Sequence, residues 1–283
     1  MAAPTVSADR AADLHLHTCY SDGTLTPAEL AREASARGLS TIAVTDHDTL
    51  ASFSEAQAAA REQGLELLPG IELSAQAGPN DVHLLAYLFD VEDPDLRRWL
   101  TEMQAARRRR LDAMLERLRR LGIALSLEDV LAVAGPGTVG RLHVARALAQ
   151  RGVVHHANVA FDKYLGEGKP AYVADDKPTP AEVIRRVRAA RGVPVLAHPM
   201  YLKDDTLITA FARDGLAGLE VFHSSHDVST QLRYRRLAEQ ERLLMTGGSD
   251  CHGLAKGQML VGSVKLPYTY VEQLKTWHAQ TYG

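Results

Sequence analysis

The sequence predicts an α/β protein in which a mostly parallel sheet closes into a barrel. Short apolar segments alternate with amphipathic segments along most of the chain, which is the order that builds parallel sheets. The sequence contains no GxGxxG turn, the motif that would indicate an open dinucleotide-binding sheet. Polar residues gather at or just after the predicted strand ends, where barrel enzymes place their reacting groups.

Predicted strands and helices alternate up to residue 94. In the helix predicted over 26–38, Thr26 and Glu29 occupy the positions of a capping box. Gly38 follows the last turn, as glycine often does at helix ends. A second helix is predicted over about 52–64. The predicted strands of this half are 12–17, 39–46, 65–74 and 81–89.

The same alternation resumes after residue 174. The predicted strands are 193–198, 217–222 and 243–250, and the predicted helices are 179–191, about 204–214 and 229–241. Because one α/β barrel commonly spans ~250 residues, both halves are expected to belong to a single barrel.

Residues 95–173 interrupt this alternation. They begin with a long amphipathic helix, followed by shorter helical segments, and none of them has the character of a barrel strand. The apolar side of the long helix contains Leu96, Leu100, Met103, Leu111, Met114, Leu118 and Leu121. We therefore predict a barrel made of 1–94 and 174–283 and a helical insertion, 95–173, that caps the active site.

Composition restricts the possible partners and location. A hydrophobic content of 46% in 283 residues is enough for a full core without disulfides. Lys and Arg total 32 against 35 for Asp and Glu, and the net charge of −3 argues against an extended nucleic-acid surface. The N-terminal segment has no secretory pattern, and no run of ~18 apolar residues occurs. We expect a cytoplasmic protein without a membrane partner.

Histidines and acidic residues occur in pairs at the predicted strand ends. His15 and His17 are one residue apart on a strand, so their side chains share one face, and Asp250 and His252 have the same spacing. A single residue such as His83 could be an ordinary core histidine. However, six of the 12 histidines fall at such positions, which predicts a multinuclear metal site. The ligands predicted from these positions are His15, His17, His47, Glu72, His83, His198, Asp250 and His252.

The predicted ligand set combines imidazole and carboxylate groups. This mixture suits Mn²⁺, Zn²⁺ or Fe²⁺ and needs no thiolate. Cys19 and Cys251 alternate with predicted ligands along the chain, which directs them to the opposite face. We therefore do not expect either cysteine to bind the metal.

The chain resembles the polymerase-and-histidinol-phosphatase (PHP) family of the amidohydrolase superfamily in DLHLHTCYSDGTLTPAEL, AVTDHDTL, PGIELSA, VLAHP and GGSDCHG. These blocks occur in order and span nearly the whole chain. Within the insertion, GRLHVARALAQRG and AFDKYLGEGKPAYV resemble the TrpH-like branch of that family. Members of this branch are 3′,5′-nucleotide bisphosphate phosphatases or 5′→3′ exoribonucleases that trim short RNA.

The resemblance implies a distorted (β/α)7 barrel with up to three metal ions. Several family members have histidine where this chain has Asp22. A carboxylate there can still bind a hard divalent cation, and it either weakens that site or favours Mn²⁺ over Zn²⁺. The resemblance assigns His15, His17 and Asp250 to the first ion, and Glu72 would bridge the first ion to the second. His83 and His198 would complete the second ion. Asp22, His47 and His252 would hold the third.

The expected reaction is hydrolysis of the 3′-phosphate of a 3′,5′-nucleotide bisphosphate, for example of 3′,5′-adenosine bisphosphate to AMP. A metal-bridging hydroxide would attack the phosphorus. Glu72 and Asp250 would hold the metals, and either a metal-bound water or His223 could protonate the leaving group. The expected substrate contacts are Arg141 as a bidentate phosphate clamp, His223, Lys177 and Ser224, although a salt bridge, a surface lysine or a polar loop would also explain such residues.

Other interpretations remain open. The arginine run 107–110 spreads around most of a helical turn, so it cannot form a single-sided patch. The nearby residues Arg119, Arg120, Glu102 and Glu116 favour a solvated helix face over an RNA contact. His143 could pack the insertion or donate to a substrate.

The alternatives to the bisphosphate phosphatase are a 5′→3′ exoribonuclease acting on short 5′-phosphorylated RNA and a non-catalytic, metal-binding regulatory barrel. A histidinol phosphatase fits the barrel motifs but not the insertion. The expected partners are a small nucleotide or short RNA, with no extended DNA surface.

Overall fold

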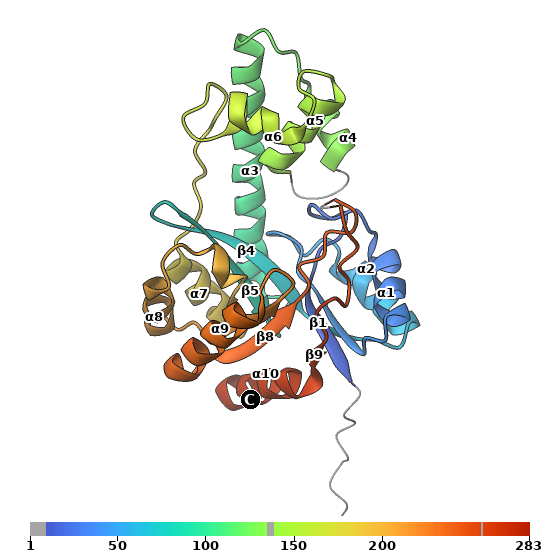
Figure 1. The fold of residues 1–283 in the computed structure, drawn as a ribbon, viewed down its shortest axis with the longest axis vertical. Helices are drawn as coiled ribbons and strands as arrows, with labels where there is room; N and C mark the ends of the chain where they lie inside the picture. The colour runs from blue at the N-terminus through green and yellow to red at the C-terminus, as the bar shows by residue number, and fades with distance from the viewer. Residues whose placement is uncertain (1–9, 135–138, 256) are drawn as a thin grey trace, which may run out of the picture.

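The computed structural model describes residues 10–134, 139–255 and 257–283, which form a mixed α/β fold (Figure 1). Helices flank two sheets on both sides, and one long helix rises above them. The strands are β1 Ala11–Leu16, β2 Thr41–Val44, β3 Glu66–Leu68, β4 Gly70–Ala77, β5 Asn80–Tyr87, β6 Val193–Leu196, β7 Gly218–His223, β8 Leu244–Gly248 and β9 Leu266–Pro267. The helices are α1 Pro27–Ala36, α2 Phe53–Glu62, α3 Pro94–Arg120, α4 Leu127–Ala134, α5 Arg141–Gln150, α6 Ala157–Ala160, η1 Phe161–Leu165, α7 Pro180–Ala189, η2 Pro199–Tyr201, α8 Thr206–Arg213, α9 Val228–Glu241 and α10 Tyr268–Tyr282.

The strands form two sheets. The first has the order β3-β2-β1-β9, and the second has the order β4-β5-β6-β7-β8. Neighbouring strands are parallel except in the pairs β1–β9, β4–β5 and β5–β6. Isolated parallel bridges join Leu16 to Cys251 and His47 to Glu72 where the two sheets meet. Among the described residues, no continuous ladder closes the two sheets into one barrel.

The single strand predicted over 65–74 is wrong, because the chain forms two strands there. β3 pairs with β2, whereas β4 pairs antiparallel with β5. Pro69 separates them and has no N–H to donate to a ladder. A Cβ on the next residue, Gly70, would lie 3.0 Å from the carbonyl oxygen of Val44. The break lets the chain leave the first sheet and bring Glu72 into the second.

The helices pack on the sheets much as their sequences predict. The capping box of α1 is confirmed, since Oγ1 of Thr26 accepts from the N–H of Glu29 at 3.3 Å and Oε2 of Glu29 accepts from the N–H of Thr26 at 2.8 Å. α1 and α2 cover the first sheet, and α7, α8 and α9 cover the second (Figure 1). α10, for which we predicted no element, buries Val271 and Leu274 against the ends of both sheets.

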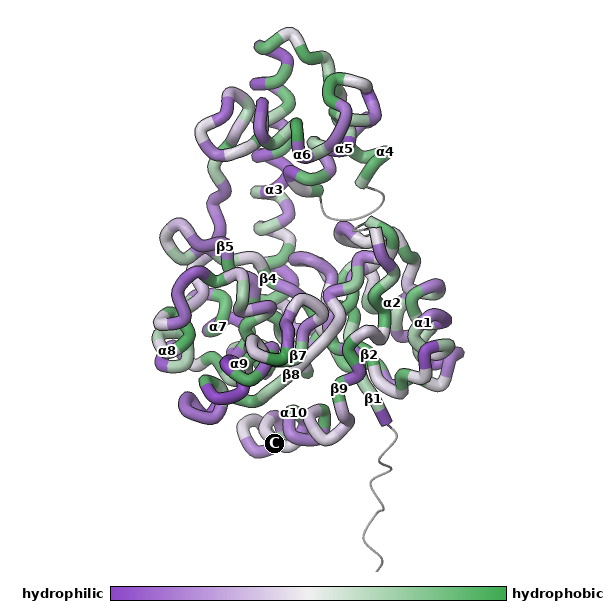
Figure 2. The backbone as a smooth tube through the Cα atoms, viewed as in Figure 1, coloured by the Kyte–Doolittle hydropathy of each residue, from purple (hydrophilic) through white to green (hydrophobic). Residues whose placement is uncertain are grey.

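The insertion is built on α3 and stands above the sheets (Figure 1). Leu96 and Leu100, near the start of α3, belong to a hydrophobic core shared with the second sheet. Leu111 and Leu118 belong to another core, whose members all come from residues 111–173. Figure 2 shows hydrophobic and hydrophilic residues alternating along this helix. α3 is therefore one continuous helix that joins two cores. In the described ranges, no helix combines the length and apolar character that crossing a bilayer requires.

Candidate metal centre

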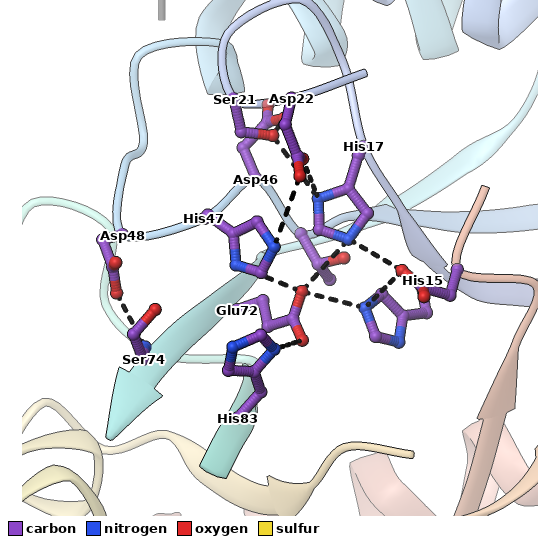
Figure 3. A network of polar contacts seen from close by, with 12 residues as sticks. His15, His17, Ser21, Asp22, Asp46, His47, Asp48, Glu72, Ser74 and His83 are labelled. Carbon is purple, nitrogen blue, oxygen red and sulfur yellow. Dashed lines mark hydrogen bonds and ion pairs between the residues drawn. The ribbon is translucent and has the colours of Figure 1, made fainter. Parts of the chain in front are cut away.

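Glu72 of β4 lies at the centre of a buried cluster of imidazoles (Figure 3). Its side chain is only 1% exposed. One carboxylate oxygen, Oε2, faces three rings, and the other, Oε1, faces two. The contacts are Oε2 with Nε2 of His15 at 3.1 Å, Nε2 of His17 at 3.1 Å and Nδ1 of His47 at 3.4 Å, and Oε1 with Nδ1 of His83 at 2.9 Å and Nε2 of His198 at 3.0 Å. Rings from four separate segments of the chain thus meet at one carboxylate of a fifth segment, β4.

Two further carboxylates border this cluster. Oδ1 of Asp250, after β8, lies 3.2 Å from Nε2 of His17 and 3.4 Å from Nε2 of His15. Oδ1 of Asp22, in the loop after β1, lies 3.2 Å from Nε2 of His252. The structure therefore brings all nine predicted ligands together, and their roles as ligands stay predictions.

Hydrogen bonds fix the protonated nitrogen of two rings. Nδ1 of His15 lies 2.9 Å from Oε1 of Glu220, and Nδ1 of His252 lies 2.8 Å from the carbonyl oxygen of Asp250. Ionised carboxylates and carbonyl oxygens only accept, so each ring donates from Nδ1 and directs Nε2 towards the cluster. This is the orientation that metal-binding histidines adopt.

His17 also donates from Nδ1 and directs Nε2 into the cluster, and the surroundings of its Nε2 explain why a cation fits there. Its Nδ1 lies 3.4 Å from Oγ of Ser21, whose own hydrogen is donated to Asp46 at 2.6 Å. Its Nε2 is buried between Glu72 and Asp250 and has no hydrogen-bond partner among the described residues. A nitrogen lone pair and carboxylate oxygens at this distance repel one another unless a proton or a metal ion lies between them. The donor set therefore fits divalent cations.

The ligand atoms form four groups in which all atoms lie within 4.8 Å of one another, and three of these groups consist of predicted ligands. Their imidazole and carboxylate atoms suit Mn²⁺, Zn²⁺ or Fe²⁺. No cysteine of the described ranges belongs to any group. The three groups are His17, Asp22, His47 and His252; His15, His17, Glu72 and Asp250; and His47, Glu72 and His83.

Burial and neighbouring charges shift the pKa values in this cluster. Burial alone would raise the pKa of Glu72, but the imidazoles, led by His47 and His15, hold that pKa well below its usual range. Burial lowers the pKa of His47 to about 3, against the effect of the carboxylates. Burial also opposes protonation of His17, but Asp250 and Glu72 raise its pKa to about 9. At neutral pH, Glu72 is thus ionised and His47 neutral, whereas His17 holds a proton that a bound metal ion would displace.

Several residues around the cluster adopt uncommon backbone conformations. Asp48, His198 and Asp250 have positive φ angles of 53°, 24° and 53°. Aspartate tolerates this region of conformational space, whereas for His198 it is strained. Gly248 lets β8 approach β1, because a Cβ at this position would lie 2.3 Å from the Cβ of His15. These local conformations hold the ligand side chains in one place.

His223, at the end of β7, is oriented differently from the rings described above. Its Nδ1 accepts from the backbone N–H of Ser225 at 3.1 Å, so the neutral ring has its proton on Nε2. Nε2 is buried 3.7 Å from Oδ2 of Asp250 and has no hydrogen-bond partner among the described residues. His223 therefore presents a donor, rather than a lone pair, to the cluster.

A cavity of about 150 Å³ lies between the cluster and the insertion. Asp22, His47 and His83 line it on the side of the cluster. The opposite side is lined by cationic and polar groups of the insertion and of the segment that returns from it. They include Arg107, Arg110, Arg141, His143, Asp175 and Lys177.

The prediction that the arginine run in α3 forms a solvated face is wrong for two of its four members. Arg107 contacts the buried carboxylate of Asp48 and donates to Oγ of Ser74 at 2.8 Å. Arg110 contacts Asp175, and its side chain is 9% exposed. Both arginines extend towards the cavity because they lie on the face of α3 that is directed at the sheets.

The sequence contains a signal for these two arginines. Arg107 and Arg110 continue the spacing of three and four residues set by Leu100 and Met103 and resumed by Met114. A charged residue within an apolar helical stripe is buried only when it has a partner. The partners, however, come from distant segments, and only the folded chain shows them.

The predicted substrate contacts differ in their positions. Arg141 begins α5 and lines the cavity, with its guanidinium 5.8 Å from the ring centre of Tyr172. It forms no ion pair with any residue in the described part of the chain. Lys177 also lines the cavity, but its ammonium group contacts Asp81. Ser224 is exposed and lies outside the cavity, because the loop after β7 turns away there.

Acidification is expected to destabilise the insertion through His143. Burial lowers the pKa of His143 to about 4. The charges of Arg146 and Arg107 lower this pKa further, whereas the charge of Asp22 raises it. The ring is neutral in the folded protein, and its Nδ1 accepts from the N–H of Gly140 at 3.1 Å. Below the unfolded pKa of about 6.5, only the unfolded chain takes up the proton, so stability falls by on the order of 3 kcal/mol by pH 4.

His143→Gln tests this expectation, because glutamine also serves as an acceptor in a capping box but does not titrate. Urea unfolding at pH 7 and at pH 4.5 should show a smaller loss of stability in the variant than in the unmodified chain. Equal losses would show that other groups cause the acid sensitivity.

Comparisons with known proteins agree with this geometry. Residues 13–164 match the family model described as PHP domain. A 5′-3′ exoribonuclease of Haemophilus influenzae is 34% identical over 245 residues, which cover 85% of this chain and 89% of that protein. A 3′,5′-nucleoside bisphosphate phosphatase of Chromobacterium violaceum is 34% identical over 256 residues, covering 88% of this chain and 90% of that protein. A solved structure from Bifidobacterium adolescentis, of a candidate metal-dependent phosphoesterase, aligns with a TM-score of 0.84 and 35% identity over 94% of this chain and 96% of that chain.

Proposed function

The chain belongs to the PHP domain family, and on that premise we propose that it removes the 3′-phosphate from 3′,5′-nucleoside bisphosphates. It is a metal-dependent phosphoesterase. The observation that supports this substrate is the cation-lined cavity beside the candidate metal centre. A bisphosphate has one phosphate to place at the metal centre and a second to place in the cavity. 3′,5′-Adenosine bisphosphate is the proposed test substrate, with AMP as its product.

We propose Mn²⁺ as the metal, with up to three ions. Ions held there would supply an attacking hydroxide and neutralise charge on the phosphate oxygens. The buried Nε2 of His17 and the ionised Glu72 support ligation, and the carboxylate of Asp22 favours a hard cation over Zn²⁺. The proposed ligands are His15, His17, Asp22, His47, Glu72, His83, His198, Asp250 and His252.

His223 is the proposed proton donor to the leaving 3′-oxygen. The backbone N–H of Ser225 holds its proton on Nε2, at the edge of the cluster beside Asp250. This donor orientation distinguishes His223 from His15, whose Nδ1 donates to Glu220 and whose Nε2 faces the cluster. A positioned donor of this kind typically contributes a factor of about 10² to 10⁴ to the rate.

The second phosphate of the substrate is proposed to lie in the cavity. Nη2 of Arg110 is buried and has no hydrogen-bond partner within the described ranges, so it can donate to a phosphate oxygen. Arg141 offers a guanidinium that no carboxylate of the described residues neutralises. A volume of about 150 Å³ accommodates a phosphate but not a whole nucleotide, so the nucleoside would extend out of the cavity.

Two architectural proposals accompany this function. The bridges between Leu16 and Cys251 and between His47 and Glu72 support a distorted seven-stranded barrel made of β1, β2 and β4 to β8. The separate core within residues 111–173 supports the division into a barrel, 1–94 and 174–283, and a capping insertion, 95–173.

Phosphate release from 3′,5′-adenosine bisphosphate tests the proposed function. The full chain, stripped of metal with a chelator and then supplied with Mn²⁺, is expected to release phosphate and form the 5′-monophosphate. The stripped protein is expected to be inactive, because the hydroxide and the charge neutralisation both come from the metal. Release that is unaffected by metal removal would contradict the proposal.

A 5′→3′ exoribonuclease is the second candidate, because a relative with that name is equally similar at 34% identity. The same preparation should therefore be offered a 5′-phosphorylated oligoribonucleotide. Shortening of this RNA without release of phosphate from the bisphosphate would favour the exoribonuclease. Inactivity on both substrates would favour the non-catalytic barrel.

A further inference from the structure

We infer that Glu220 is a positioning residue of the metal centre, which orients His15 and His198 without itself binding metal. Glu220 lies in the middle of β7, and its side chain is 0% exposed. It is not one of the nine proposed ligands. The inference rests on the proposed function, since it concerns the same metal centre.

The first oxygen of Glu220 controls His15. Oε1 accepts from Nδ1 of His15 at 2.9 Å. Nε2 on the other side of the ring lies 3.1 Å from Oε2 of Glu72 and 3.4 Å from Oδ1 of Asp250. Glu220 is therefore behind the ring, on the side away from the cluster, and keeps the nitrogen lone pair directed into the cluster. Carboxylate–histidine–metal chains are built in this way.

The second oxygen of Glu220 controls the backbone of His198. Oε2 accepts from the backbone N–H of His198 at 2.7 Å. His198 has φ 24° and ψ 63°, a strained conformation for a residue that precedes proline. Nε2 of its ring lies 3.0 Å from Oε1 of Glu72. The hydrogen bond to Glu220 thus holds a turn that would otherwise relax and withdraw the ring from the cluster.

The alternative is that Glu220 is itself a ligand, together with His15 and His223, whose ligand atoms lie close enough. The hydrogen bonds argue against this. Nδ1 of His15, the nitrogen that faces Glu220, donates to Oε1 and therefore has a proton and no lone pair for a metal. Nδ1 of His223 accepts from Ser225, so its Nε2 has a proton and no lone pair for a metal. Glu220 therefore acts through its neighbours.

Glu220→Gln is the decisive variant because it keeps the shape of the side chain but has only one acceptor oxygen for two donors. If the amide oxygen stays with the N–H of His198, the NH₂ group faces Nδ1 of His15 and forces the proton of that ring onto Nε2. Mn²⁺ affinity should fall about 10- to 100-fold, as measured by calorimetric titration of the metal-stripped full chain. Glu220→Asp, which keeps two acceptors, should bind Mn²⁺ more tightly than Glu220→Gln.

Tyr87→Phe is the matched control. Tyr87 is also buried beside the cluster, but its hydroxyl donates to the carbonyl oxygen of Leu14 at 2.8 Å and not to the side chain of a proposed ligand. It should lower the melting temperature and leave Mn²⁺ affinity unchanged. An unchanged Mn²⁺ affinity in Glu220→Gln would overturn the inference about Glu220 but not the proposed metal centre. An equal loss of Mn²⁺ affinity in Tyr87→Phe and Glu220→Gln would have the same consequence. Failure of the unmodified chain to bind Mn²⁺ would overturn the proposed metal centre and this inference with it.

Discussion

Asp250→Asn is expected to lower kcat/KM for 3′,5′-adenosine bisphosphate by more than about 10³-fold, beyond the loss seen for a single oxyanion-stabilising donor. The charge of Asp250 lies 3.2 Å from His17 and 3.4 Å from His15, where it would bind the first metal. Asparagine keeps the volume but not the charge. It also tolerates the positive φ of 53° at this position, whereas Asp250→Ala adds backbone strain to the test.

The comparison requires both a fold control and an activity control. Circular dichroism of Asp250→Asn should match that of the unmodified chain, because the backbone conformation is preserved. Asp227→Asn should keep full activity, since Asp227 caps α9 by accepting from the N–H of Thr230 at 2.7 Å and from Oγ of Ser229 at 2.9 Å, and asparagine caps equally well. Turnover that persists in Asp250→Asn would refute the assignment of the metal ligands.

Arg141→Ala is expected to raise KM for 3′,5′-adenosine bisphosphate by about 10- to 100-fold, the value of a hydrogen bond to a charged group. Arg141 lines the cavity and forms no ion pair within the described residues, so its charge is available to the second phosphate of the substrate. Adenosine 3′-monophosphate lacks that phosphate. Steady-state kinetics on this substrate should therefore be nearly the same in the variant and in the unmodified chain.

A second arginine of the insertion provides the control. Arg108 is exposed and paired with Asp112 at 3.2 Å, one turn further along α3. Arg108→Ala should change neither KM nor kcat with either substrate. If Arg141→Ala weakened both substrates equally, Arg141 would act on the reacting phosphate or on the fold, and the cavity would not be the second phosphate site.

The grouping of the histidines and carboxylates into one cluster could be predicted because its signals are local. A spacing of two residues on a strand places His15 and His17 on one face whatever the rest of the chain does. A strand end followed by histidine or aspartate, as at His47 and Asp250, also needs no knowledge of distant segments. The capping box of α1 was predictable for the same reason, since its hydrogen bonds join Thr26 to the next turn.

The remaining features depend on contacts between distant segments. The break at Pro69 changes the sheet to which the chain belongs, and an apolar run from 65 to 74 does not reveal this. Glu220 stands in an apolar strand, which is a signal, but its partners lie 205 and 22 residues away in sequence. Arg107 is explained only by Asp48, 59 residues away. Such pairings are set by tertiary packing, which sequence periodicity does not contain.

The length of α3 between Leu100 and Arg107 determines where Arg107 and Arg110 lie relative to the sheets. Residues near its start are fixed in the core of the sheets, and Arg107 and Arg110 follow at a set rotation about the helix axis. Each added or removed residue between Leu100 and Arg107 would turn the outer half of the helix by about 100° and shift it by about 1.5 Å. An insertion of about seven residues, close to two full turns, would return the arginines to nearly the same direction and place them about 10 Å further along the helix axis. In the proposed substrate complex, the length of this segment would set the distance between the reacting phosphate and the second phosphate.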